Sequence, residues 1–77
     1  MTTLQRIQEC ICEASGASRE DITREANLFS DLGLDSLDLV EAILNIEAEF
    51  DLDIPDSAMD RFNTVQDLVS YVEEVTA

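Results

Sequence analysis

Apolar residues recur at helical spacing near both ends of the chain. Near the N-terminus, four apolar residues three or four positions apart would share one face of a helix: Leu4, Ile7, Ile11 and Ala14. Thr2 and Gln5 have the pattern of a capping box before this stripe, and Gly16 is a typical helix end. Near the C-terminus, the segment 64–67 (TVQD) repeats the capping pattern before a second stripe: Val65, Leu68, Val69, Val72 and Val75. The sequence therefore predicts a helix at each end.

A second helix is predicted from Ser36 to Phe50, with either Asp35 or Ser36 as its cap. One apolar stripe on this helix would face the core: Leu39, Ile43, Ile46 and Phe50. A second stripe lies nearly opposite, among acidic residues: Leu37, Leu44 and Ala48. Because a helix that packs on one side needs only one apolar stripe, we expect a partner to contact the second.

The connection from Gly16 to Leu34 is long for a small domain, so we expect its own side chains to hold it in place. Four apolar residues can do this: Ile22, Leu28, Phe29 and Leu32. Residues 18–21 (SRED) predict a turn of helix, and residues 56–62 a short helix. The expected fold is all-α, a small four-helix bundle of three longer helices and one short helix with a long first loop. Residues 1–77 are expected to form a single domain.

Charge narrows the choice of partners. The chain has 18 acidic residues, four arginines and no lysine, and its formal net charge is −14. Such a surface repels phosphate backbones and anionic lipids, so we expect neither nucleic-acid binding nor membrane insertion. Partners with basic patches are expected instead. With no basic leader and no long apolar run, the sequence predicts a cytoplasmic protein, and its high charge and lack of a large apolar patch favour a monomer.

Several kinds of chemistry are disfavoured by composition. The chain has no histidine, so no Ser-His or Cys-His pair can form. Calcium loops counted from Asp31 or Asp51 lack the glycine and glutamate that an EF-hand requires. Cys10 and Cys12 would point in nearly opposite directions from one helix, so we expect two reduced thiols. We therefore expect neither an enzyme nor a metal site.

Ser36 lies in the segment DLGLDSLDLV, residues 31–40, at the predicted start of the second helix. Its hydroxyl is either a helix cap or a point of attachment. The N–H groups and the dipole at a helix N-terminus favour a phosphate, so a phosphodiester on Ser36 would be well placed there.

The segment LGLDSLDLVE, followed by EFDLDIPD, resembles the signature region of the acyl carrier proteins, and the likeness extends over essentially the whole chain. The resemblance implies that a phosphopantetheinyl transferase attaches 4′-phosphopantetheine from coenzyme A to Ser36. The arm would carry acyl intermediates as thioesters between enzymes of fatty-acid or related polyketide or lipid biosynthesis. The protein itself would catalyse nothing.

The resemblance also implies two further sets of residues. One set would dock on the basic surfaces of acyl-processing enzymes: Asp35, Leu37, Asp38, Glu41, Leu44 and Glu47. The other would line a cavity for the acyl chain: Leu39, Ile43, Ile46, Phe50, Ile54, Phe62 and Leu68. Bulky side chains at Phe50, Met59 and Phe62 would then limit the length of the cargo.

Some features depart from the pattern of general fatty-acid carriers. Asn45 is polar, Ala48 interrupts the acidic run, and Leu34 is bulkier than the alanine common before the serine. A dedicated carrier for one pathway, with an aminoacyl, polyketide or envelope-lipid cargo, is therefore an alternative. An unmodified acidic helical docking module is another.

Overall fold

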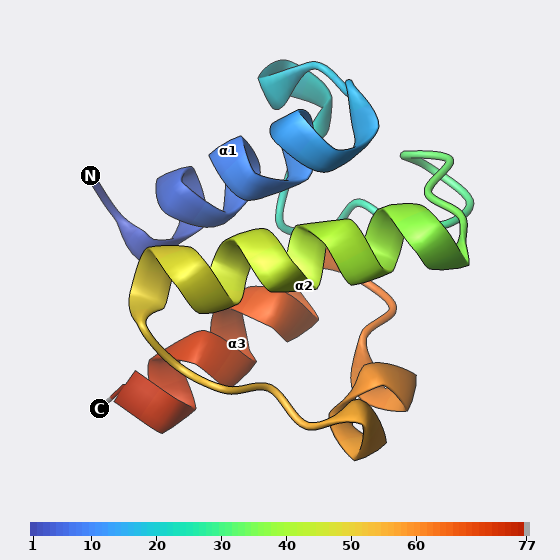
Figure 1. The fold of residues 1–77 in the computed structure, drawn as a ribbon. Helices are drawn as coiled ribbons and strands as arrows, with labels where there is room; N and C mark the ends of the chain where they lie inside the picture. Colours follow the sequence, from blue (N-terminus) through green and yellow to red (C-terminus); the bar gives the residue numbers. More distant parts are fainter. Residues whose placement is uncertain (77) are drawn as a thin grey trace.

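The structure, a computed structural model, describes residues 1–76 (Figure 1). It contains three α-helices and two short 3₁₀ helices: α1 (Thr3–Ser15), η1 (Arg19–Asp21), α2 (Ser36–Phe50), η2 (Asp56–Arg61) and α3 (Val65–Thr76). The predicted all-α bundle is confirmed, and η1 is the expected turn of helix in the first loop. Within the described residues, no helix is both long and apolar enough to span a bilayer.

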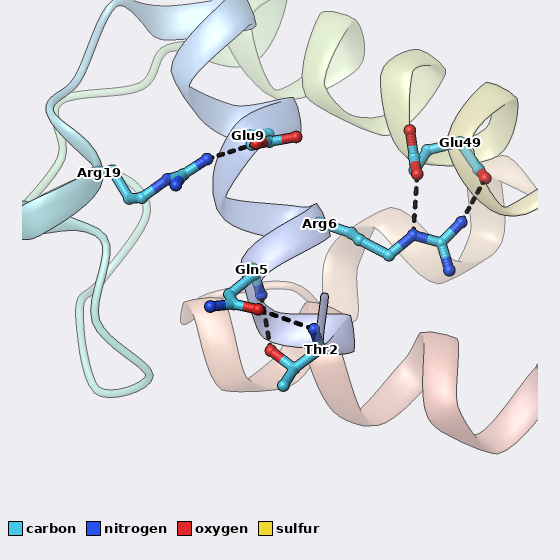
Figure 2. Close-up of polar contacts among 6 residues, drawn as sticks. All are labelled: Thr2, Gln5, Arg6, Glu9, Arg19 and Glu49. Carbon is cyan, nitrogen blue, oxygen red and sulfur yellow. Dashed lines mark hydrogen bonds and ion pairs between the residues drawn. The ribbon is translucent and has the colours of Figure 1, made fainter.

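The ends of α1 follow from the residues that border it. The Thr2 hydroxyl accepts a hydrogen bond from the Gln5 backbone N–H at 3.1 Å, and the Gln5 side chain accepts one from the Thr2 N–H at 2.8 Å (Figure 2). Gly16 ends the helix with φ at 76°, a left-handed conformation that glycine adopts without steric cost. The predicted capping box and helix end are both confirmed.

α1 and α2 run side by side in opposite directions (Figure 1), and α3 packs against α1. Their apolar stripes meet in one core, whose largest fully buried side chains come from all three helices and the first loop: Ile7, Ile11, Ile22, Leu28, Ile46, Leu68, Val65, Val69 and Val72. Burial of these side chains supplies most of the force that holds so small a bundle together.

Polar contacts fasten α1 to α2 at the edge of the core. The Arg6 guanidinium donates to a Glu49 carboxylate oxygen and to the Glu49 carbonyl, both at 2.8 Å (Figure 2). It also lies 4.2 Å from the centre of the Phe50 ring. The amide of Asn45 donates to the Cys10 carbonyl at 3.2 Å, so this polar residue joins the two helices.

The long first loop is held partly as expected. Ile22 and Leu28 are fully buried and Leu32 packs against the core, but Phe29 is 40% exposed, so the expectation that Phe29 holds the loop was wrong. Backbone hydrogen bonds to the residues at the start of α3 hold this part of the loop in place instead. They join Leu28 N–H to Asn63 O, Val65 N–H to Ala26 O, and Gln66 N–H to Arg24 O, at 2.8 to 3.0 Å.

Candidate functional site

Ser36 is the first residue of α2, and its side chain is exposed. The helix cap is its neighbour Asp35, whose carboxylate accepts the Asp38 N–H at 2.8 Å, while the Asp38 carboxylate accepts the Asp35 N–H at 3.4 Å. Within residues 1–76 the Ser36 hydroxyl makes no hydrogen bond. The two candidate caps of the sequence are thereby distinguished: Asp35 starts the helix, and Ser36 keeps its hydroxyl available.

Beside Ser36 the surface is hollowed between the N-terminal half of α2, the first loop and η2, which lies beneath this end of α2 (Figure 1). The hollow has a volume of about 360 Å³. Both apolar and polar residues line it: Phe29, Ser36, Leu39, Val40, Met59, Asp60, Phe62 and Asn63. Such a hollow can receive an apolar group that is tethered near the Ser36 hydroxyl.

Two of the residues expected to line a cavity, Leu39 and Phe62, lie on the wall of this hollow. The other five do not. Four are buried in the core, away from the wall: Ile43, Ile46, Ile54 and Leu68. Phe50 is half-buried at the opposite end of α2, beside Arg6. Helical periodicity identifies the residues that face inward, but it does not show which of them border the space between η2 and the start of α2.

Four lining residues were missed by the sequence reasoning: Phe29, Val40, Asp60 and Asn63. Val40 had a detectable signal, because it lies three residues after Leu37 and four before Leu44 on the predicted helix. The other three are in loops or at the margin of η2, where helical periodicity gives no information.

The second stripe of α2 is exposed, as the sequence predicts. Leu37 is 66% exposed and Leu44 57%, and Val40 extends the stripe at 43%. We name these three residues the α2 apolar face. An exposed apolar face of this kind on a highly charged chain is typical of an interaction site.

The acidic residues expected to dock partners divide into two groups. Asp35 and Glu41 are exposed. Asp38 is half-buried and completes the helix cap, and a Glu47 carboxylate oxygen accepts the Ile54 N–H at 2.7 Å. Glu47 therefore fixes the chain as it leaves α2, in addition to adding negative charge.

None of the four arginines belongs to α2. Arg6 pairs with Glu49, and Arg19 pairs with Glu9 (Figure 2). Arg24 donates to the Gln66 side chain at 2.7 Å, and Arg61 lies over the Tyr71 ring. The carboxylates around the α2 apolar face are thus left without these cations, and the field there stays negative.

The far edge of the hollow is positioned by the start of α3. One Asp67 carboxylate oxygen accepts the N–H groups of Asn63 and Thr64, both at 2.9 Å, and the Asp67 N–H donates to the Thr64 hydroxyl at 3.3 Å. These backbone donors lower the pKa of Asp67, so the carboxylate is ionised at neutral pH. The predicted capping box is confirmed, and it fixes the backbone next to Phe62.

The two cysteines and the carboxylates are poorly placed for nucleophilic chemistry or metal binding. Burial, followed by the carboxylates of Glu49 and Glu13, raises the pKa of the Cys10 thiol to about 11. Cys12 is half-buried, and both cysteines are reduced. Among residues 1–76, no three cysteine or carboxylate side chains gather as metal ligands.

One comparison with known proteins bears on this site. A family model described as a phosphopantetheine attachment site matches residues 5–72, most of the chain. The match extends from α1 into α3 and includes Ser36, the hollow and the α2 apolar face.

Proposed function

The chain belongs to the phosphopantetheine-attachment family, and from this premise we propose that Ser36 bears the arm and that the protein delivers acyl groups between biosynthetic enzymes. Carriers of this family hold 4′-phosphopantetheine covalently. The cargo that we propose comes from fatty-acid or related polyketide or lipid biosynthesis. When bound, the arm supplies a terminal thiol that holds the acyl group as a thioester.

One observation supports Ser36 above all: it is exposed and lines the hollow, while Asp35 caps the helix. The Ser36 oxygen can therefore be esterified without loss of a cap. Its position at the N-terminus of α2 places the phosphodiester where the helix dipole is favourable.

The attachment is tested by intact mass. The purified chain is incubated with coenzyme A, magnesium and a broad-specificity phosphopantetheinyl transferase. We expect a gain of one phosphopantetheine in the wild type and none in Ser36→Ala. Ser30→Ala, which removes another exposed serine, is the matched control and should be modified like the wild type.

Two results would contradict this proposal. Modification of Ser36→Ala would place the arm on another residue. A folded wild type that gains no mass would favour the unmodified docking module.

We further propose that partners dock on the α2 apolar face through apolar contact, with the surrounding carboxylates steering basic surfaces toward it. Exposure of Leu37, Val40 and Leu44 on one side of α2 supports this proposal. Glu41 and Asp35 lie close to this face in sequence and are themselves exposed.

Docking is tested by reversing one charge. Glu41→Lys should lower kcat/KM of the transferase by about tenfold at low salt, because the encounter rate depends on charge complementarity. Glu73→Lys changes net charge equally at an exposed position on α3 and is the matched control. Equal effects of the two substitutions would show that net charge matters and the α2 face does not. The difference should shrink as salt rises.

A further inference from the structure

Phe62 lies between two hollows. Its ring is 2% exposed and belongs to the wall of the hollow at Ser36. It also belongs to a second hollow of about 190 Å³, which lies toward α3 and is lined by Arg61, Phe62, Asp67, Ser70, Tyr71 and Glu74. One residue thus borders both a largely apolar space and a more polar one.

Tyr71 holds this ring from the side of α3. The centres of the Phe62 and Tyr71 rings are 5.4 Å apart and their planes meet at 82°, an edge-to-face contact. Such contacts have a preferred geometry and therefore restrict rotation of the rings.

Arg61 completes the arrangement. Its guanidinium carbon lies 5.7 Å from the centre of the Tyr71 ring, and within residues 1–76 Arg61 forms no ion pair. Arg61 and Phe62 are consecutive, at the end of η2, so this one turn of chain contacts Tyr71 with a cation and with an aromatic ring.

We infer that Tyr71 is a positioning residue that sets cargo length, because it holds Phe62 as the end wall of the hollow at Ser36. This inference rests on the proposed function. With the Phe62 ring in place, an alkyl chain that enters beside Ser36 ends against an apolar wall. Past that wall, the chain would meet the polar groups of Asp67, Ser70 and Glu74, where burial of further methylenes gains little.

The cargo class that follows is a short acyl chain. A longer chain is accommodated only if the Phe62 ring turns away from Tyr71 and joins the two hollows. Loss of the Tyr71 ring removes the contact that opposes this rotation, so it should extend the range of chain lengths that the protein shields from water.

The test compares thioester lifetimes across chain length. Wild type, Tyr71→Leu and Tyr71→Phe are loaded by the transferase with acyl groups from butyryl to dodecanoyl, and hydrolysis is followed by intact mass. The wild type should protect the shorter chains best. Tyr71→Leu should lengthen the lifetimes of the longer chains about two- to tenfold, a range set by the strength of an edge-to-face contact. Tyr71→Phe keeps the ring and should match the wild type.

A second variant, Arg61→Ala, keeps the inference testable if Tyr71→Leu does not fold. Arg61 is exposed, so Arg61→Ala should fold, and it should shift the profile in the same direction by a smaller factor. If the loaded proteins fold and Tyr71→Leu and Arg61→Ala keep the wild-type profile, the inference is wrong. A uniform loss of protection at all lengths, with Tyr71→Phe equally affected, also overturns it.

A measurement on the unloaded protein separates this inference from the proposed function. Failure of the wild type to load would refute attachment at Ser36. The rate at which the Phe62 ring flips, measured by NMR, needs no arm: it should rise in Tyr71→Leu and stay unchanged in Tyr71→Phe. Equal flip rates in all three proteins would refute the positioning role of Tyr71.

Discussion

Replacement of Phe62 by alanine is expected to lower the free energy of unfolding by about 3–5 kcal/mol, the usual loss for a buried phenylalanine. The ring is 2% exposed, and its removal also ends the contact with Tyr71. A domain of this size has only about 4–12 kcal/mol of stability in total, so the variant should lose a large share of it. Urea unfolding followed by circular dichroism measures the loss.

Phe29→Ala is the matched control, because Phe29 is also on the wall of the hollow at Ser36 but is 40% exposed. It should cost about 1 kcal/mol or less. Equal losses in the two variants would show that Phe62 does not have the packing role described above.

The same substitution bears on cargo. Where Phe62→Ala remains folded, at low temperature or in a stabilising osmolyte, the enlarged hollow should protect thioesters of longer acyl chains than the wild type does. Equal lifetimes in mutant and wild type at every chain length would contradict the enlargement.

Added salt is expected to raise the melting temperature by several degrees. The net charge is −14, and in the described structure two acidic residues, Glu9 and Glu49, form ion pairs. The remaining carboxylates repel one another, more strongly in the compact state than in the unfolded chain. Screening relieves this repulsion, and in a domain this small each 1 kcal/mol shifts the melting temperature by about 4–8 °C. Thermal unfolding in a sodium chloride series measures the effect.

A variant with fewer charges tests the cause. Glu13→Gln, Glu25→Gln and Glu73→Gln, combined, remove exposed carboxylates from α1, the first loop and α3 without touching a cap or an ion pair. This variant should melt at a higher temperature than the wild type at low salt and gain less from added salt. A melting temperature that stays constant or falls with salt would contradict the role of repulsion.

The sequence was most informative where one residue determines a helix end. Thr2 with Gln5, Gly16, and Thr64 with Asp67 set helix ends through local hydrogen bonds or backbone conformation, and these are visible in a single sequence. The two apolar stripes of α2 were also visible, because the helical spacing of the apolar residues places them on opposite sides of the helix.

Features that depend on tertiary packing were harder to predict from the sequence. Phe29 is apolar and was expected to hold the first loop, but backbone bonds to Asn63 and to the start of α3 hold it instead. The pattern of side chains in a sequence does not reveal backbone hydrogen bonds between distant segments. The location of the hollow depends in the same way on how η2 sits against α2, which left Ile43 and Ile46 in the core and not on its wall.

The choice of Asp35 as the cap of α2 has a consequence for repeated use of the molecule. Because the helix begins through Asp35 and Asp38, a group can be added to the Ser36 oxygen, or removed from it, without breaking a hydrogen bond that starts α2. If Ser36 bears the arm, as we propose, loaded and bare forms can share one fold, and no refolding step needs to separate one delivery from the next. On that proposal, a single copy can serve many rounds of synthesis.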